Sequence, residues 1–119
     1  MEDDEPQARI ARTVIAEADM VVLPITVLCE LVWVLGRAYG VAGATIAYAM
    51  TELCHAEKMS VDRRLFAAGL AMMKAGGDFA DGVIAHEGRM LGAEVFVSFD
   101  VSAVKLLAAQ GVKARVAAA

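Results

Sequence analysis

Residues 94–100 read Glu-Val-Phe-Val-Ser-Phe-Asp, and this stretch decides the fold class. Its centre is a short apolar run rich in valine and phenylalanine, which is typical of a buried β-strand. A helix is predicted directly after it over residues 101–109, and another short strand over residues 112–116. Strands separated by helical segments indicate an α/β fold with a parallel sheet.

The rest of the chain extends this pattern. Residues 20–23 form a β-branched run that ends at Pro24, which suits a third buried strand. Pro24 is also well placed as the first residue of a helix. The predicted helices before residue 94 span residues 6–18, 24–38, 42–56, 61–75 and 79–91. A parallel sheet needs both faces covered, yet six helices over three strands are too many. An α/β domain with this many helices is expected to have at least one more central strand, and the sequence lacks it.

Composition narrows the class of protein. The 119 residues suit one domain, which is expected to span residues 1–119. With 59% apolar and 22% charged residues, the composition excludes a disordered chain. The most apolar window is interrupted by Pro24 and Glu30, whereas a membrane span needs about 20 nearly uninterrupted apolar residues. No basic and then apolar leader opens the chain, so we expect a cytoplasmic protein with no membrane contact.

The negative charge is concentrated at the N-terminus. Residues 2–5 hold four of the 15 acidic residues, so the rest of the chain has 11 acids against 11 bases. The net charge of −4 therefore belongs to this run. A neutral body lacks the basic stripe that is typical of nucleic-acid-binding proteins, so any binding of RNA is expected at a local site.

Glu30 stands out because of the helix in which it lies. The segment 24–38 is apolar nearly all round and is therefore predicted to be buried on most faces. A carboxylate in such a place is costly unless it is paired, hydrogen-bonded or bound to a metal. An ion pair with a basic residue elsewhere is one interpretation, and a ligand role, which we favour, is the other.

Three aspartates occupy the starts of predicted helices. Asp78 lies at the N-cap position of the helix over residues 79–91, and Asp81 lies near the position of a capping-box acid. Asp100 directly follows a predicted strand, so it lies at the carboxyl end of that strand, where open α/β sheets bind ligands. It is equally placed to cap the next helix. Capping and ligand binding therefore stay open for all three.

Acids from different elements that converge at one sheet edge repel one another, and a hard divalent cation relieves that repulsion. Mg²⁺ takes oxygen ligands and is commonly held by one or two carboxylates. A bound ion of this kind polarises a phosphoryl oxygen and activates water. The residues therefore favour a metal-dependent phosphodiesterase of low specificity.

Three segments, in this order, match a known family. They are residues 23–35 (Leu-Pro-Ile-Thr-Val-Leu-Cys-Glu-Leu-Val-Trp-Val-Leu), residues 77–85 (Gly-Asp-Phe-Ala-Asp-Gly-Val-Ile-Ala) and residues 95–100 (Val-Phe-Val-Ser-Phe-Asp). Over essentially its whole length the chain resembles PIN-domain proteins, and in particular the VapC-like ribonuclease toxins of bacterial toxin–antitoxin systems. The resemblance implies a three-layer α/β/α sandwich with a short parallel sheet.

The resemblance also implies a function. The family's acidic cluster binds Mg²⁺ or Mn²⁺ and cuts RNA, and the toxin is usually dimeric and held by a cognate antitoxin protein. Glu30, Asp81 and Asp100 match the family's acids and are the expected catalytic residues and metal ligands, whereas Asp78 is at best auxiliary. Family members begin with a strand that carries an Asp-x-Asn motif. Because residues 1–6 resemble the segment just after it, we expect the first central strand to be missing and the activity to be impaired.

Two other hypotheses come from different classes of protein. The first is a non-catalytic interaction protein, a degenerate PIN domain that binds an antitoxin or itself. The second, which is weaker, is an unrelated flavodoxin-like binding module, but we find no phosphate-binding glycine loop after a strand. A sheet without its central strand has unpaired edges that invite pairing with another chain, so we expect a homodimer or larger assembly.

Overall fold

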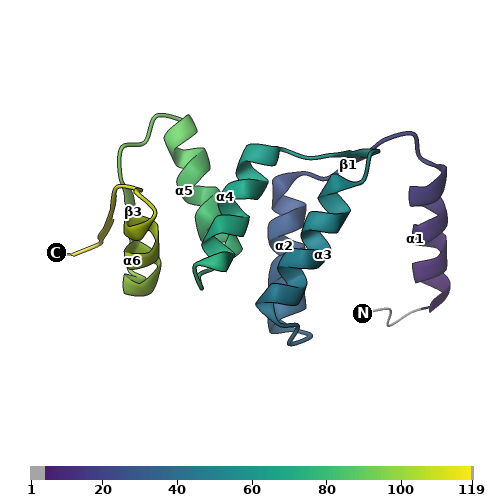
Figure 1. Ribbon diagram of the computed structural model, residues 1–119, viewed down its shortest axis with the longest axis horizontal. Coiled ribbons are helices and arrows are strands. Elements are labelled where there is room, and N and C mark those ends of the chain that lie inside the picture. The colour runs from purple at the N-terminus through teal and green to yellow at the C-terminus, as the bar shows by residue number, and fades with distance from the viewer. Residues whose placement is uncertain (1–4, 119) are drawn as a thin grey trace. The chain divides into compact units, whose positions relative to one another are not determined.

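Helices alternate with short parallel strands in the computed structural model, which describes residues 5–118 (Figure 1). The chain divides into two units, residues 1–61 and residues 62–119. The elements of unit 1 are α1 (Glu5–Glu17), β1 (Val21–Val22), α2 (Ile25–Arg37), α3 (Gly43–His55) and β2 (Met59–Ser60). Those of unit 2 are α4 (Arg63–Lys74), α5 (Phe79–Met90), β3 (Phe96–Ser98), α6 (Val101–Ala109) and β4 (Ala114–Val116).

Unit 1 is built around the helices α2 and α3, which lie side by side (Figure 1). Each helix buries one apolar stripe at helical spacing, which is how an amphipathic helix packs. The buried residues are Leu28, Val32 and Leu35 of α2 and Ile46, Met50 and Cys54 of α3. The strands β1 and β2 pair in parallel, with Val21 opposite Met59 and Val22 opposite Ser60.

Helix α1 has no buried residue. Its apolar side chains Ile10 and Val14 are exposed. The ammonium group of Lys58 donates to the carbonyl oxygens of Ile15 and Ala16, at 2.9 and 3.2 Å, and so satisfies two acceptors at the end of the helix. Lys58, the residue before β2, therefore contacts α1 through polar groups.

Unit 2 packs α4 closely against α5. Two glycines permit the approach. A Cβ atom on Gly69 would meet the ring of Phe79 at 2.5 Å, and one on Gly82 would collide with the carbonyl oxygen of Ala68. The ring of Phe79 lies 6.1 Å from that of Phe66, centroid to centroid, and is almost fully buried. This interface holds much of the apolar burial in unit 2.

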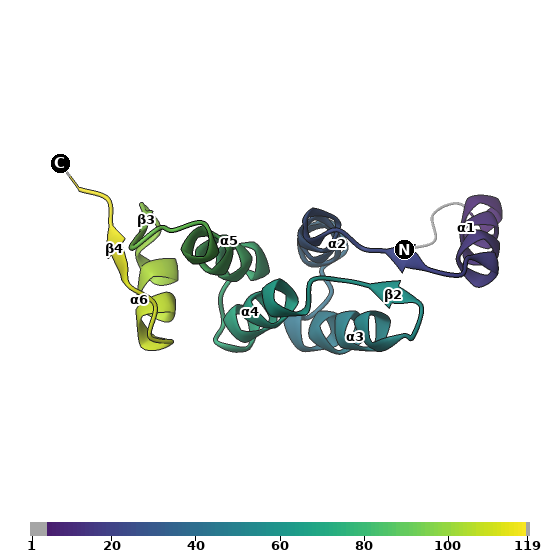
Figure 2. The same cartoon turned by 90° about the horizontal axis from the view of Figure 1, so that it is seen from above.

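The second part of unit 2 is a strand, helix and strand. β3 and β4 pair in parallel with Phe96 opposite Ala114 and Ser98 opposite Val116, and α6 lies against both strands (Figure 2). A buried cluster joins this part to α4 and α5 through Met72, Ala85, Ala103 and Leu107. The starts of α5 and α6 are fixed relative to each other by this shared core.

The α/β class and the parallel pairing predicted from the sequence are confirmed, as are all six helices to within about two residues. Within the described residues the strands pair two by two, β1 with β2 in unit 1 and β3 with β4 in unit 2. The strand β2 was missed because two residues carry no readable periodicity.

Candidate functional site

Two aspartate side chains cap the helices that begin near the carboxyl end of β3. Asp78 is the N-cap residue of α5, and its Oδ1 accepts a hydrogen bond from the backbone N–H of Ala80 at 3.3 Å. Asp100 is the N-cap residue of α6, and its Oδ1 accepts from the backbone N–H of Ala103 at 3.1 Å. The capping predicted for both residues is confirmed, and so is the place of Asp100 after the strand.

Asp81 lies in the first turn of α5, one turn after Asp78, so the two carboxylates share one side of the helix. Its side chain is half-buried and accepts no hydrogen bond from any residue that the structure describes. Burial raises the pKa of the Asp81 carboxyl, and the negative charges of Asp78 and then Asp100 raise this pKa further. Asp81 is therefore repelled by the carboxylates of both Asp78 and Asp100; we call these three residues the aspartate cluster.

The turn before α5 explains why the sequence places an acid there. Gly76 ends α4 with a φ of +96°, a conformation that side-chain-bearing residues rarely adopt. Gly77 then passes so close to Met72 and Leu106 that a Cβ atom would meet the Met72 Cε at 2.7 Å. This turn brings Asp78 to the N-cap position, where the dipoles of the first peptide groups favour a negative charge.

The chemistry of the aspartate cluster fits a hard cation. Asp78 and Asp100 each use Oδ1 as a helix cap, which leaves Oδ2 without a hydrogen bond from the described residues. Carboxylate oxygens are the donors that Mg²⁺ and Mn²⁺ prefer. A positive ion would also offset the repulsion that raises the pKa of Asp81. However, no group of three or more His, Cys, Asp or Glu residues within 5–118 is arranged to hold a metal ion.

Glu30 belongs to unit 1, on α2, whereas the aspartate cluster belongs to unit 2. The prediction that α2 is buried on most faces was wrong: only one stripe is buried, and the Glu30 side chain is exposed. The argument that a buried Glu30 would need an ion pair or a metal therefore does not apply, because its carboxylate is exposed. Glu30 lies at an open apolar hollow of α2 that is also lined by Thr26, Val27, Leu31 and Val34.

From the sequence, Asp78 was predicted to have at best an auxiliary role, which underestimates its effect on Asp81. After burial, its charge is the larger of the two electrostatic causes that raise the pKa of Asp81, ahead of that of Asp100. The signal was present as the three-residue spacing of Asp78 and Asp81 on one helix, since residues three apart are neighbours on a helix surface. The ligand roles of Glu30, Asp81 and Asp100 stay predictions.

Comparison with known families assigns the protein class. The sequence matches the PIN domain over residues 1–106, a match that includes residues of both units. The chain belongs to the PIN-domain family. PIN domains are generally metal-dependent nucleases that typically use a divalent ion, and nucleic acid is the partner that the family implies. No similar curated protein and no similar solved structure was found. No helix in the described part of the chain is long and apolar enough to cross a membrane.

Proposed function

We propose that this protein is a metal-dependent endoribonuclease of the VapC-like type, the toxin of a toxin–antitoxin pair that acts in the cytoplasm. Its two units form a single PIN-like domain over residues 1–119, and a cognate antitoxin protein holds it. Mg²⁺ or Mn²⁺ is the cofactor, single-stranded RNA is the substrate, and the chain associates with itself. Glu30, Asp81 and Asp100 are the metal ligands, and Asp78 assists them.

The observation that carries this proposal is the raised pKa of Asp81 beside two further carboxylates, in a chain of the PIN family. A helix cap requires only a side-chain oxygen that accepts from a backbone N–H group in the first turn, and no second acid beside it. Here a half-buried acid with no hydrogen-bond donor among the described residues faces two neighbours of the same charge. Groups with pKa values perturbed in this way are more common at functional sites than elsewhere.

Each residue has a distinct task under this proposal. Asp78 and Asp100 hold one carboxylate oxygen fixed through the backbone N–H groups of Ala80 and Ala103 and present the other. Asp81 supplies a charge whose repulsion by its neighbours ends when a cation binds. When bound, the ion activates water and stabilises charge on the phosphoryl oxygens. Glu30 contributes a further carboxylate from α2.

Impaired activity is part of the proposal. Because the described residues offer no group of three or more possible ligands, the ion should bind weakly and cleavage should be slow. The same observation favours the second candidate function, a non-catalytic PIN protein that binds an antitoxin or itself. Exposed large apolar side chains, such as Tyr48 at 70% and Phe99 at 87%, suit an interaction protein.

The test is cleavage of a fluorescently labelled single-stranded RNA with Mg²⁺ or Mn²⁺, with and without chelator. Slow, chelator-sensitive cleavage is expected. Asp81→Asn and Asp100→Asn should each lower the rate at least about tenfold, the loss typical even of groups that only support a metal ligand. Glu52→Gln, which changes an exposed acid of α3, is the matched control and should leave the rate unchanged.

Two results would decide against the nuclease. Cleavage that survives chelator, or that Asp81→Asn and Asp100→Asn leave unchanged, would show that the aspartate cluster is not the site. A chain that is folded by circular dichroism and cuts no RNA with either metal would favour the interaction protein.

A further inference from the structure

Phe99 lies between β3 and the aspartate cluster, as the residue directly before Asp100. Its side chain is 87% exposed, so the other residues of unit 2 cover little of the ring. A single exposed apolar side chain is normal on a protein surface and needs no explanation of its own. What sets Phe99 apart is its position beside a proposed metal ligand.

The backbone on both sides of Phe99 is held by hydrogen bonds within unit 2. The carbonyl oxygen of Ser98 accepts from the N–H of Ala117 at 2.8 Å, and the Oγ of Ser98 accepts from the N–H of Asp100 at 3.0 Å. The side chain of Asp100 in turn accepts from the N–H of Ala103. An aromatic side chain has few rotatable bonds, so on an anchored turn it loses little conformational freedom when a ligand binds.

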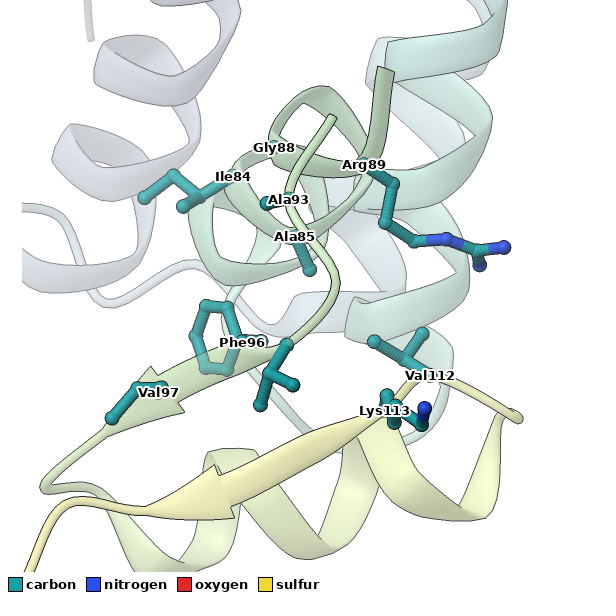
Figure 3. Close-up of a pocket in the computed structure, with 10 residues that line it drawn as sticks. Ile84, Ala85, Gly88, Arg89, Ala93, Phe96, Val97, Val112 and Lys113 are labelled. Carbon is teal, nitrogen blue, oxygen red and sulfur yellow. The ribbon is translucent and has the colours of Figure 1, made fainter. Parts of the chain in front are cut away.

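A cation lies on the neighbouring strand. Arg115 of β4 is the register partner of Val97, and its side chain is exposed. Figure 3 shows Val97 near the carboxyl end of β3, two residues before Phe99. Strand geometry therefore places the Cα atoms of Arg115 and Phe99 about 8 Å apart. An arginine side chain is long enough to reach a phosphate next to a base that stacks on the ring.

We propose that Phe99 stacks on an unpaired base of the RNA beside the phosphate held at the aspartate cluster, and that Arg115 binds a neighbouring phosphate. This inference rests on the proposed nuclease function and adds a base-contacting residue to it. Proteins commonly hold single-stranded nucleic acid with aromatic rings and nearby cations, because every base has a face on which a ring can stack. With a net charge of −4 the chain gains little from long-range attraction of phosphates, so a local site of this kind supplies the affinity.

The probe is a single-stranded RNA of eight adenosines, bound to the full 119-residue chain. Ca²⁺ takes the place of Mg²⁺, since it also binds carboxylate oxygens, and electrophoresis of the RNA checks that it stays intact. The ring-proton NMR signals of Phe99 should move upfield on binding, because a stacked base shields them. A residue that only supported the fold would show no such shift.

Phe99→Ala should weaken binding of this RNA at least about fivefold, the lower end of what a stacked base contributes. Phe99→Trp keeps an aromatic face and should bind at least as tightly as the parent. The matched control, Leu91→Ala, removes a similarly exposed apolar side chain at the end of α5 away from Asp78 and should leave binding unchanged.

Arg115→Gln should lower the slope of log Kd against log salt concentration by about 0.7, the loss of one phosphate contact on a single strand. Lys113→Gln changes a cation just before β4 begins, at the other end of that strand, and should keep the slope (Figure 3).

Binding that Phe99→Ala leaves unchanged, or Phe99 ring signals that do not move, would overturn the proposal. Nuclear Overhauser contacts of the free chain's Phe99 ring with unit 1, or ring signals that move with protein concentration, would also overturn it, since the ring would then be covered by the chain itself or by a second copy. The two proposals fail separately. Cleavage with the parent's KM in Phe99→Ala would reject this inference alone, whereas RNA binding with the ring shift but no cleavage in Mg²⁺ or Mn²⁺ would keep the base contact and reject the nuclease.

Discussion

Unit 2 begins each of its helices with an aspartate cap, namely Asp62, Asp78 and Asp100. In unit 1, α2 and α3 begin after Pro24 and Ala42, neither of which caps a helix with its side chain. Unit 2 also uses Gly69 and Gly82 to bring two helices into close contact, whereas α1 of unit 1 buries nothing.

This comparison shows in which part of the chain the local sequence is enough to determine the structure. In unit 2 the caps, the glycines and the buried aromatic residues all favour the same structure. A sequence folds reliably when its local preferences agree with the overall fold in this way. In unit 1 the buried stripes of α2 and α3 are correct, but little local chemistry fixes the starts of the helices. The candidate site follows this division, since two of its three clustered acids, Asp78 and Asp100, are helix caps of unit 2.

The largest expected effect comes from the contact between α4 and α5. Gly82→Ala should lower the free energy of unfolding of unit 2 by about 3 kcal/mol, because its Cβ would collide with Ala68 and lie 2.7 Å from the Met72 Cβ. Gly88→Ala, in the same helix, is the control: its Cβ would meet only Ala93, at 3.8 Å, so a gain of about 0.5 kcal/mol is expected. Urea unfolding measures both. Equal effects at the two glycines would contradict the close packing.

A smaller effect is expected from exchanging the caps of the two units. Asp62 accepts from the backbone N–H groups of Arg64 and Leu65, so Asp62→Ala should cost about 1 kcal/mol. Ala42 has the extended backbone of an N-cap residue but no accepting side chain, so Ala42→Asp should gain about 0.5 kcal/mol. If Ala42→Asp destabilises unit 1, its helix starts are fixed by something other than local capping.

The pH dependence of stability tests the repulsion at Asp81. Its pKa in the folded chain is raised, so the folded state binds more protons than the unfolded state between the two pKa values. The free energy of unfolding therefore falls as pH rises through that interval, beginning near the unfolded value of about 3.9. Asp81→Asn removes this fall, so the stability of the variant relative to the parent should rise from acid to neutral pH. Parallel pH profiles for the two proteins would show that Asp81 is not repelled.

The smallest expected effect is stabilisation by metal. Mn²⁺ near its dissociation constant should raise the free energy of unfolding by less than about 1 kcal/mol, and Asp81→Asn should reduce this gain. Thermal unfolding with and without Mn²⁺ measures it. If Asp81→Asn leaves the metal response unchanged and costs about 1 kcal/mol at neutral pH, Asp81 serves only as a helix-capping acid.

The sequence predicted much of this structure because its signals are local. The helix stops at Gly76 and Gly92, both with positive φ, and the caps at Asp78 and Asp100 depend on neighbours within a few residues. It failed where the outcome depends on residues far along the chain. The exposure of Glu30 reflects how little of α2 is covered in unit 1, and the pairing of β2 with β1 joins residues nearly 40 positions apart.

The raised pKa of Asp81 was beyond sequence analysis for the same reason. Its second charged neighbour, Asp100, comes from another helix, and only the packed core of unit 2 fixes how close the two lie. Sequence spacing revealed the candidates, but the fold determines their electrostatics.

The most direct test of the central claim, that the aspartate cluster is a cation site, is a titration with Mn²⁺ followed by NMR. Paramagnetic broadening should begin at the amides of residues 78–82 and 98–101 and, since Glu30 is a proposed ligand, at residue 30. Asp81→Asn should weaken this broadening, whereas Asp62→Asn, a cap outside the aspartate cluster, should not. Broadening that begins elsewhere, or that Asp81→Asn leaves unchanged, would contradict the assignment of the metal to these residues.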